Sequence, residues 1–153
     1  MLEAFLGFIT SLISSILPGL LKKKEASEHR KNYDEIRREV AEALSMYACC
    51  FYNPVDLADT QDHKLPSFYD EGSVRIRALA AKLKALAETL PTGKNDLPIN
   101  ADDMLDAARY LFGISNSFHT PYGMGSSSTD WQHLRGWEDE LRRLLDLKSR
   151  NYK

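Results

Sequence analysis

Residues 33–52, YDEIRREVAEALSMYACCFY, decide the fold because they repeat an apolar side chain every three or four positions. The repeat runs through Tyr33, Ile36, Val40, Ala43 or Leu44, Tyr47, and Cys50 or Phe51. This spacing gathers apolar groups on one face of a helix and leaves arginine and glutamate on the other. We expect a helix from about Ala26 to Tyr52, ending before Pro54 because proline pushes the preceding residue out of the helical region.

Three downstream segments carry the same helical period, at 73–90, about 101–118 and about 130–147. Asn100 is a suitable N-cap for the second of them. Prolines, acidic residues and a final glycine mark 53–72 as a loop, whose Leu65, Phe68 and Tyr69 are expected to fold back over the core. The pattern predicts an all-α protein whose main body is a four-helix antiparallel bundle with two long loops.

Upstream, residues 1–24, MLEAFLGFITSLISSILPGLLKKK, hold one charge, Glu3, before a run of three lysines. A helix over 1–21 would be about 30 Å long, close to the hydrocarbon thickness of a bilayer. We therefore predict a membrane-anchor helix at 1–21, a basic juxtamembrane stalk at 22–32, a helical domain at 33–147 and a polar tail at 148–153. The side chains expected to face lipid are Leu2, Phe5, Leu6, Ile9, Leu12, Ile13, Ile16, Leu17 and Leu20.

The lysines follow the apolar run, so the excess of positive charge favours an inner-membrane protein whose domain faces the cytoplasm. A lipid membrane is the expected partner, with Lys22, Lys23 and Lys24 in contact with anionic headgroups. Two other arrangements stay open at this point. In the first of these, the segment is a helix that lies in the membrane interface, and in the second it is a helix buried in an oligomer.

Small and hydroxyl-bearing residues form a stripe along the leader, at Gly7, Thr10, Ser11 and Ser14. Small residues let helices approach closely in lipid, which favours a homo-oligomer. An alternative function uses the same stripe: several copies would line a pore and act as a membrane-disrupting effector.

The remaining composition argues against most other chemistry. A net charge of −2 gives no reason to expect nucleic-acid binding. Cys49 and Cys50 are neighbours in an apolar pattern and are expected to be structural. The acidic residues of 53–72 match no metal-binding spacing, so no metal is expected. No catalytic or cofactor motif is present, so we expect no catalytic residues, no cofactor and no enzymatic activity.

A glycine- and serine-rich stretch precedes the last helix and contains Gly123, Gly125, Ser126, Ser127, Ser128 and Thr129. Backbone N–H groups at a helix start attract anions, so a nucleotide- or phosphate-sensing domain is a second alternative function. The stretch lacks the Gly-Lys-Ser/Thr of a P-loop.

The order of a short apolar helix, a basic flank and a helical domain containing ARYLFGISNS at 108–117 resembles small uncharacterised bacterial proteins with an N-terminal membrane anchor. The likeness is strongest over residues 1–53 and 107–117, and it implies location and fold rather than a reaction. We therefore predict a membrane-tethered interaction or regulatory module, with an unknown protein partner and without catalytic chemistry of its own.

Overall fold

The computed structural model describes residues 2–52, 65–91, 96–118 and 128–150. Side chains are described from Ile13 in the first helix, from Ser67 in the second and from Trp131 in the last. The elements are α1 (Leu2–Met46), a 3-10 helix η1 (Ala48–Phe51), α2 (Leu65–Thr89), α3 (Ala101–Phe118) and α4 (Ser128–Leu144). The described residues contain no strand, so the prediction of an all-α helical bundle is confirmed.

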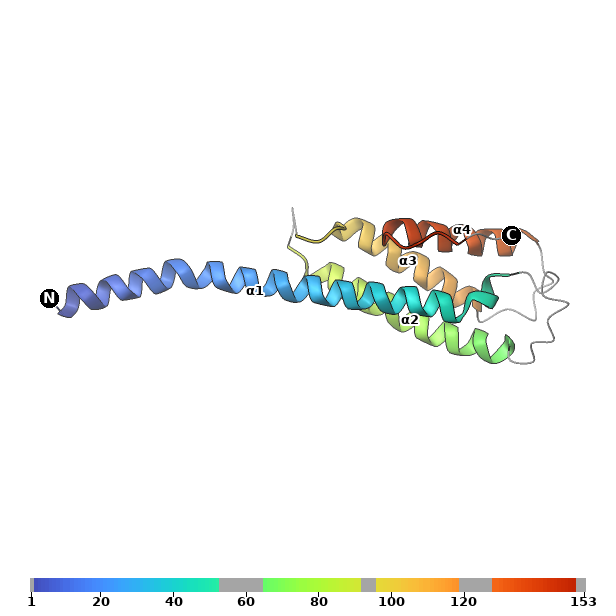
Figure 1. The fold of residues 1–153 in the computed structure, drawn as a ribbon, viewed down its shortest axis with the longest axis horizontal. Helices are drawn as coiled ribbons and strands as arrows, with labels where there is room; N and C mark the ends of the chain where they lie inside the picture. The colour runs from blue at the N-terminus through green and yellow to red at the C-terminus, as the bar shows by residue number, and fades with distance from the viewer. Residues whose placement is uncertain (1, 53–64, 92–95, 119–127, 151–153) are drawn as a thin grey trace.

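Successive helices run antiparallel to one another (Figure 1). In sequence order, α1 packs on α2, α2 on α3, and α3 on α4. The amino-terminal part of α1 projects alone beyond the other helices (Figure 1). We call residues 2–21 of α1 the arm, and residues 22–32 the stalk.

Helix α1 is continuous through the arm, the stalk and the core-forming part of the chain, and Pro18 lies inside it. The α-helix ends at Met46, earlier than the sequence pattern indicates. The Tyr47 N–H donates to the Ala43 carbonyl at 3.0 Å, and the Cys50 N–H donates to the Tyr47 carbonyl at 3.0 Å. The backbone therefore tightens from an α-helix to a 3-10 helix over its last turns, as helix ends commonly do.

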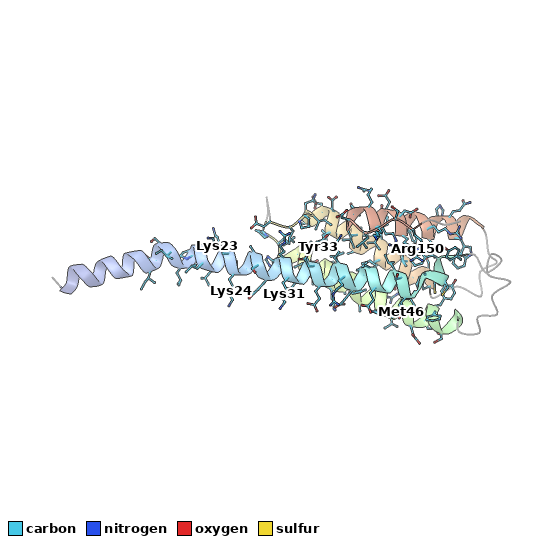
Figure 2. All side chains as sticks on the ribbon, viewed as in Figure 1. Lys23, Lys24, Lys31, Tyr33, Met46 and Arg150 are labelled. Carbon is cyan, nitrogen blue, oxygen red and sulfur yellow. The ribbon has the colours of Figure 1, made fainter. Side chains whose placement is uncertain are left out.

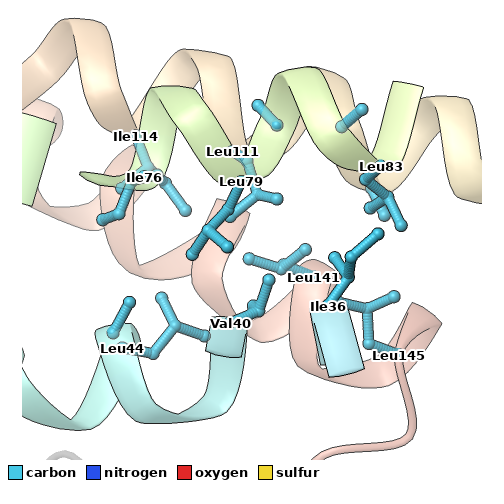
Figure 3. Packing of buried hydrophobic residues seen from close by; sticks show 14 of the residues in the cluster. Ile36, Val40, Leu44, Ile76, Leu79, Leu83, Leu111, Ile114, Leu141 and Leu145 are labelled. Carbon is cyan, nitrogen blue, oxygen red and sulfur yellow. The ribbon is translucent and has the colours of Figure 1, made fainter. Parts of the chain in front are cut away.

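The core is built from the periodic face predicted for residues 33–52. Tyr33, Val40 and Leu44 are buried, as are Tyr47 and Phe51 further along the chain. Figure 3 shows how this face meets the other helices, with side chains from α2 (Ile76, Leu79, Leu83), from α3 (Leu111, Ile114), and from α4 and the residue that follows it (Leu141, Leu145). One apolar cluster thus joins all four helices.

The start of α2 corrects the sequence analysis, which places residues 65–72 in a loop. Pro66 lies in the first turn of α2, where a missing N–H costs no helical hydrogen bond. The Ser67 hydroxyl donates to Glu71 Oε1 at 2.9 Å, one turn further on. Tyr69 is buried and Phe68 packs against the core, as expected for a segment that covers it. The rest of the predicted loop, 53–64, and the Leu65 side chain lie outside what the structure describes.

Gly72, which resembles a loop terminator in the sequence, is the point where α2 passes closest to its neighbours. A Cβ atom there would lie 3.0 Å from Phe118 Cδ2 and 3.0 Å from Tyr47 Cγ. Glycine is needed at this position because two buried rings already occupy the space, so it allows close packing rather than ending a helix.

The boundaries of α3 and α4 follow the sequence more closely. The Asp103 N–H donates to Asn100 Oδ1 at 2.8 Å, and Asn100 Nδ2 donates to Asp103 Oδ2 at 2.8 Å. Asn100 is therefore the N-cap of α3, as predicted. Helix α4 begins at Ser128 and ends at Leu144, so both ends lie slightly earlier than the predicted 130–147.

We predict that Gly72→Ala lowers the free energy of unfolding by about 1–2 kcal/mol, because the new methyl group overpacks against Phe118 and Tyr47. The matched control is Gly136→Ala on α4, where a Cβ meets nothing within 4 Å. That change should raise stability by up to about 1 kcal/mol through helix propensity alone. Urea unfolding followed by tryptophan fluorescence measures both, and a stabilising effect of Gly72→Ala would contradict the packing described.

Candidate functional site

The arm exposes apolar side chains that nothing in the described chain covers. Its Ile13, Ile16, Leu17, Leu20 and Leu21 are 54%, 49%, 52%, 58% and 52% exposed. The other exposed large hydrophobic residues of the described part are Met46 and Val74, which lie on the bundle. Among the side chains that the structure describes, exposed large apolar surface is therefore concentrated on the arm.

No helix is both long and apolar enough to cross a membrane, within the residues that the structure describes. The predicted spanning helix is therefore without support from the structure. The predicted lipid-facing side chains Leu2, Phe5, Leu6, Ile9 and Leu12 lie outside the described side chains, and so do Gly7, Thr10 and Ser11 of the small-residue stripe. Ser14 of that stripe is exposed.

The three lysines that follow the arm form a second feature, which we call the collar: Lys22, Lys23 and Lys24. All three are exposed, and Figure 2 shows Lys23 and Lys24 on the part of α1 beyond the other helices. No ion pair joins them to an acidic side chain of the described ranges. Their positive charge is therefore available to a partner.

The basic face of α2, by contrast, is occupied by groups of the chain itself. Arg75 lies 3.4 Å from Glu42, and Lys82 lies 2.8 Å from Glu39, both glutamates on α1. Lys84 pairs within α2 with Glu88, and Arg77 donates to Asn116 Oδ1 at 2.6 Å. These four cations connect helices or cover exposed helix surface, so α2 offers a partner far less charge than the collar does.

Two open hollows flank the stalk where it leaves the bundle. One, of about 570 Å³, lies between α1 and α2 and is lined by Glu28, His29, Glu39, Lys82 and Leu86 among others. The other, of about 470 Å³, is lined by Lys22, Glu25, His29, Leu90 and Asp96 among others. No group of three or more metal-binding side chains is found among the described residues. Both hollows mix opposite charges, and neither assembles a set of catalytic groups.

A buried acidic residue, Glu138, lies on α4, and Arg150 connects it to Leu44 near the carboxyl end of α1. Its side chain is 0% exposed, and Oε1 accepts hydrogen bonds from Arg142 Nε at 2.7 Å and Arg150 Nε at 2.9 Å. Burial raises the pKa of Glu138, whereas the two arginines act to lower it. Glu138 therefore lies on the core side of α4.

Glu138 belongs to a wider polar cluster around the carboxyl end of α1 and η1. The Arg150 side chain donates to the Leu44 carbonyl, and its Cζ lies 5.5 Å from the ring centroid of Phe51. Arg135 Nε donates to the Phe51 carbonyl at 2.8 Å, and the Tyr69 hydroxyl donates to the Cys50 carbonyl at 3.4 Å. Carbonyls at a helix end lack intrahelical partners, so these side chains satisfy them. The cluster stabilises structure, and it offers no open position to a substrate.

The two cysteines lie in η1 and are free thiols. Cys50 is buried, and that burial, together with the neighbouring Cys49, raises the pKa of its thiol. A nucleophilic cysteine needs a lowered pKa and some exposure, so the environment of Cys50 suits a structural role.

The candidate anion site falls largely outside the described residues. Gly123, Gly125, Ser126 and Ser127 are not described. Ser128 and Thr129 begin α4, and their side chains are not described. The phosphate-sensing alternative therefore stays a prediction from the sequence.

Comparisons with protein-family models, with curated proteins and with solved structures find no match for this chain. The resemblance to small anchored bacterial proteins therefore stays a prediction.

The contacts of buried Glu138 with Arg142 and Arg150 predict how the free energy of unfolding depends on pH. Because the pKa of Glu138 is raised above its ordinary value of 4.5, the folded state keeps the proton to higher pH than the unfolded state does. The contribution of Glu138 to the free energy of unfolding therefore falls as pH rises above 4.5. Arg142→Ala removes a group that lowers this pKa, so we expect its destabilisation to be larger at about pH 8 than at about pH 4. Chemical unfolding at both pH values measures this.

The control is Arg142→Ala in a Glu138→Gln background, which has no carboxyl group to titrate at this position. There the destabilisation should be the same at both pH values. An equal loss at both pH values in the presence of Glu138 would contradict the assignment.

Proposed function

We propose that this protein is a membrane-tethered helical interaction module, in which the arm enters a lipid surface and the bundle is presented beside it. The observation that carries the proposal is the row of half-exposed apolar side chains on a helix that lies outside the bundle, Ile13, Ile16, Leu17, Leu20 and Leu21. The collar then meets the headgroups.

The energetics of the arm support a partner that covers it. Burying one such side chain completely is favourable by about 1.5–3 kcal/mol, so the five half-exposed ones together represent on the order of 5 kcal/mol or more. A helix without tertiary contacts is also marginal in water, because most helical stability comes from packing of an apolar face. Lipid would supply both the burial and the packing.

The charge pattern favours lipid as the partner. The apolar residues end at Leu21 and the collar begins at Lys22, so the change from apolar to basic occurs within one residue. Each basic residue near an anionic membrane surface contributes about 1 kcal/mol. This proposal holds whether the arm lies in the interface or crosses the bilayer. For a crossing arm, the positive-inside rule favours a bundle in the cytoplasm at the inner membrane.

The arm test replaces Ile16 and Leu20, one turn apart, with aspartate. We expect Ile16→Asp/Leu20→Asp to lower partitioning onto lipid vesicles by about a hundredfold, because two apolar contacts are lost and two charges must enter lipid. Vesicle flotation of the full chain measures this. The matched control is Val74→Asp on α2, which changes a 68% exposed residue of the bundle and should leave partitioning unchanged. Equal binding of all three proteins would overturn the proposal.

The collar test exchanges Lys22, Lys23 and Lys24 for glutamine. We expect about a hundredfold weaker binding to vesicles rich in phosphatidylglycerol and little change on pure phosphatidylcholine, because about 1 kcal/mol per lysine is electrostatic. A control with the same change in net charge exchanges Lys84, Arg109 and Arg143 for glutamine. These three residues are paired with acidic side chains of the bundle. If the control loses as much binding as the collar variant, net charge and not the collar is responsible.

A further inference from the structure

The segment that follows α4 turns back along the bundle, and we call residues 145–150 the strap. Arg37 Nε donates to the Leu145 carbonyl at 2.6 Å, and the same guanidinium donates to the Asp146 carbonyl. Asp146 has a φ of 50°, a left-handed conformation that reverses the chain. Arg150 then reaches the Leu44 carbonyl, so the strap follows α1 for about two turns, or about 10 Å.

The strap links α1 to α4. On the α1 side it is held by Arg37 and by the Leu44 carbonyl. On the α4 side, Arg142 Nη1 donates to the Lys148 carbonyl at 2.7 Å, and Arg150 pairs with Glu138. Since α1 packs on α2 and α4 packs on α3, the strap closes the remaining edge of the bundle, between α1 and α4. Figure 2 shows Arg150 next to this part of α1.

The strap also covers part of the core. Leu145 is fully buried, and Figure 3 places it close to Ile36 and Leu141. Val40 and Leu44 continue this apolar surface along α1. Moving the strap away would therefore expose apolar side chains along the α1–α4 edge.

The contacts that hold the strap are of a kind that water can replace. Most of them join arginine side chains to backbone carbonyls, and both groups are readily solvated when they separate. Lys148 and Ser149 are exposed, and residues 147–150 have no helical structure. When Arg150 leaves, Glu138 still accepts the hydrogen bond from Arg142, which lies on the same helix. Opening therefore does not leave this carboxylate unpaired in the core.

We propose that the strap is a latch: its docking locks α1 and η1 against α4, and its release opens this edge while α2 and α3 stay packed. Arg150 is the positioning residue of the latch, because it contacts α1, α4 and the Phe51 ring together. The latch does not depend on the arm or on its partner. It gives the bundle a local opening that leaves the rest of the fold intact, and the elements that move in allosteric proteins are drawn from such low-stability regions.

Amide hydrogen exchange of the full chain tests the latch through Arg150→Ala. We expect exchange to accelerate by about tenfold to a hundredfold within residues 36–52 and 138–148, because a charged hydrogen-bond network is lost. Exchange within 76–87 and 104–114 should stay at the wild-type rate. Arg150→Lys keeps the charge but only part of the hydrogen bonding, so its exchange rates within 36–52 and 138–148 should fall between those of wild type and Arg150→Ala.

The control is Arg109→Ala, which removes an exposed pair with Asp106 on α3 and should change neither region. Uniform acceleration in all four helices would show that Arg150 contributes only to global stability and would overturn the latch. So would an Arg150→Ala protein that exchanges like wild type.

A second measurement needs no variant. In wild-type protein at increasing but sub-denaturing urea, residues 36–52 and 138–148 should share one opening free energy that is lower than that of α2 and α3. If these residues exchange only through global unfolding, the latch is wrong.

Discussion

The structure depends on the continuity of α1. One helix of 45 residues carries the core face from Tyr33 to Leu44 and also the exposed arm. The core face and the arm are therefore two parts of one continuous element, and only the core face lies against the other helices (Figure 1). The arm makes no contribution to the core of the described chain, and the bundle leaves its apolar side chains in solvent. The chain therefore combines a packed helical bundle with an apolar surface that the bundle does not cover.

At the opposite end of α1, polar side chains of other elements bind the helix through its backbone carbonyls. The change from α1 to η1 leaves backbone carbonyls that other elements must satisfy, and Arg150, Arg135 and Tyr69 do so. Burying Glu138 beside two arginines is expensive in desolvation, and such clusters often contribute more to a unique arrangement than to net stability. Here the cluster joins the end of α1 to the segment that follows α4. The two ends of α1 thus have different roles, with apolar surface available at one end and a closed polar cluster at the other.

Much of this fold follows from periodicity. The core positions of α1, the N-cap at Asn100 and the helical period of α3 are local patterns, and local patterns are readable in a sequence. The first turns of α2 are not, because Pro66 and Gly72 are typical of loops until Phe118 and Tyr47 are seen to require a glycine. Arg150 gave no signal either. It stands in a polar tail, and the Leu44 carbonyl that it contacts is 106 positions away in sequence. Glu138 carried a weak signal, since it shares the helical repeat of Leu134, Leu141 and Leu145.

The arm could be recognised in the sequence as apolar and bordered by lysines, and the lipid surface proposed to cover it is not part of the chain. Hydrogen exchange of the full protein with and without vesicles rich in phosphatidylglycerol tests the central claim most directly. The account predicts strong protection of amides within residues 2–21 when vesicles are present, and unchanged exchange within 33–147. An arm that exchanges equally fast in both conditions, or protection that appears on the bundle instead, would contradict it.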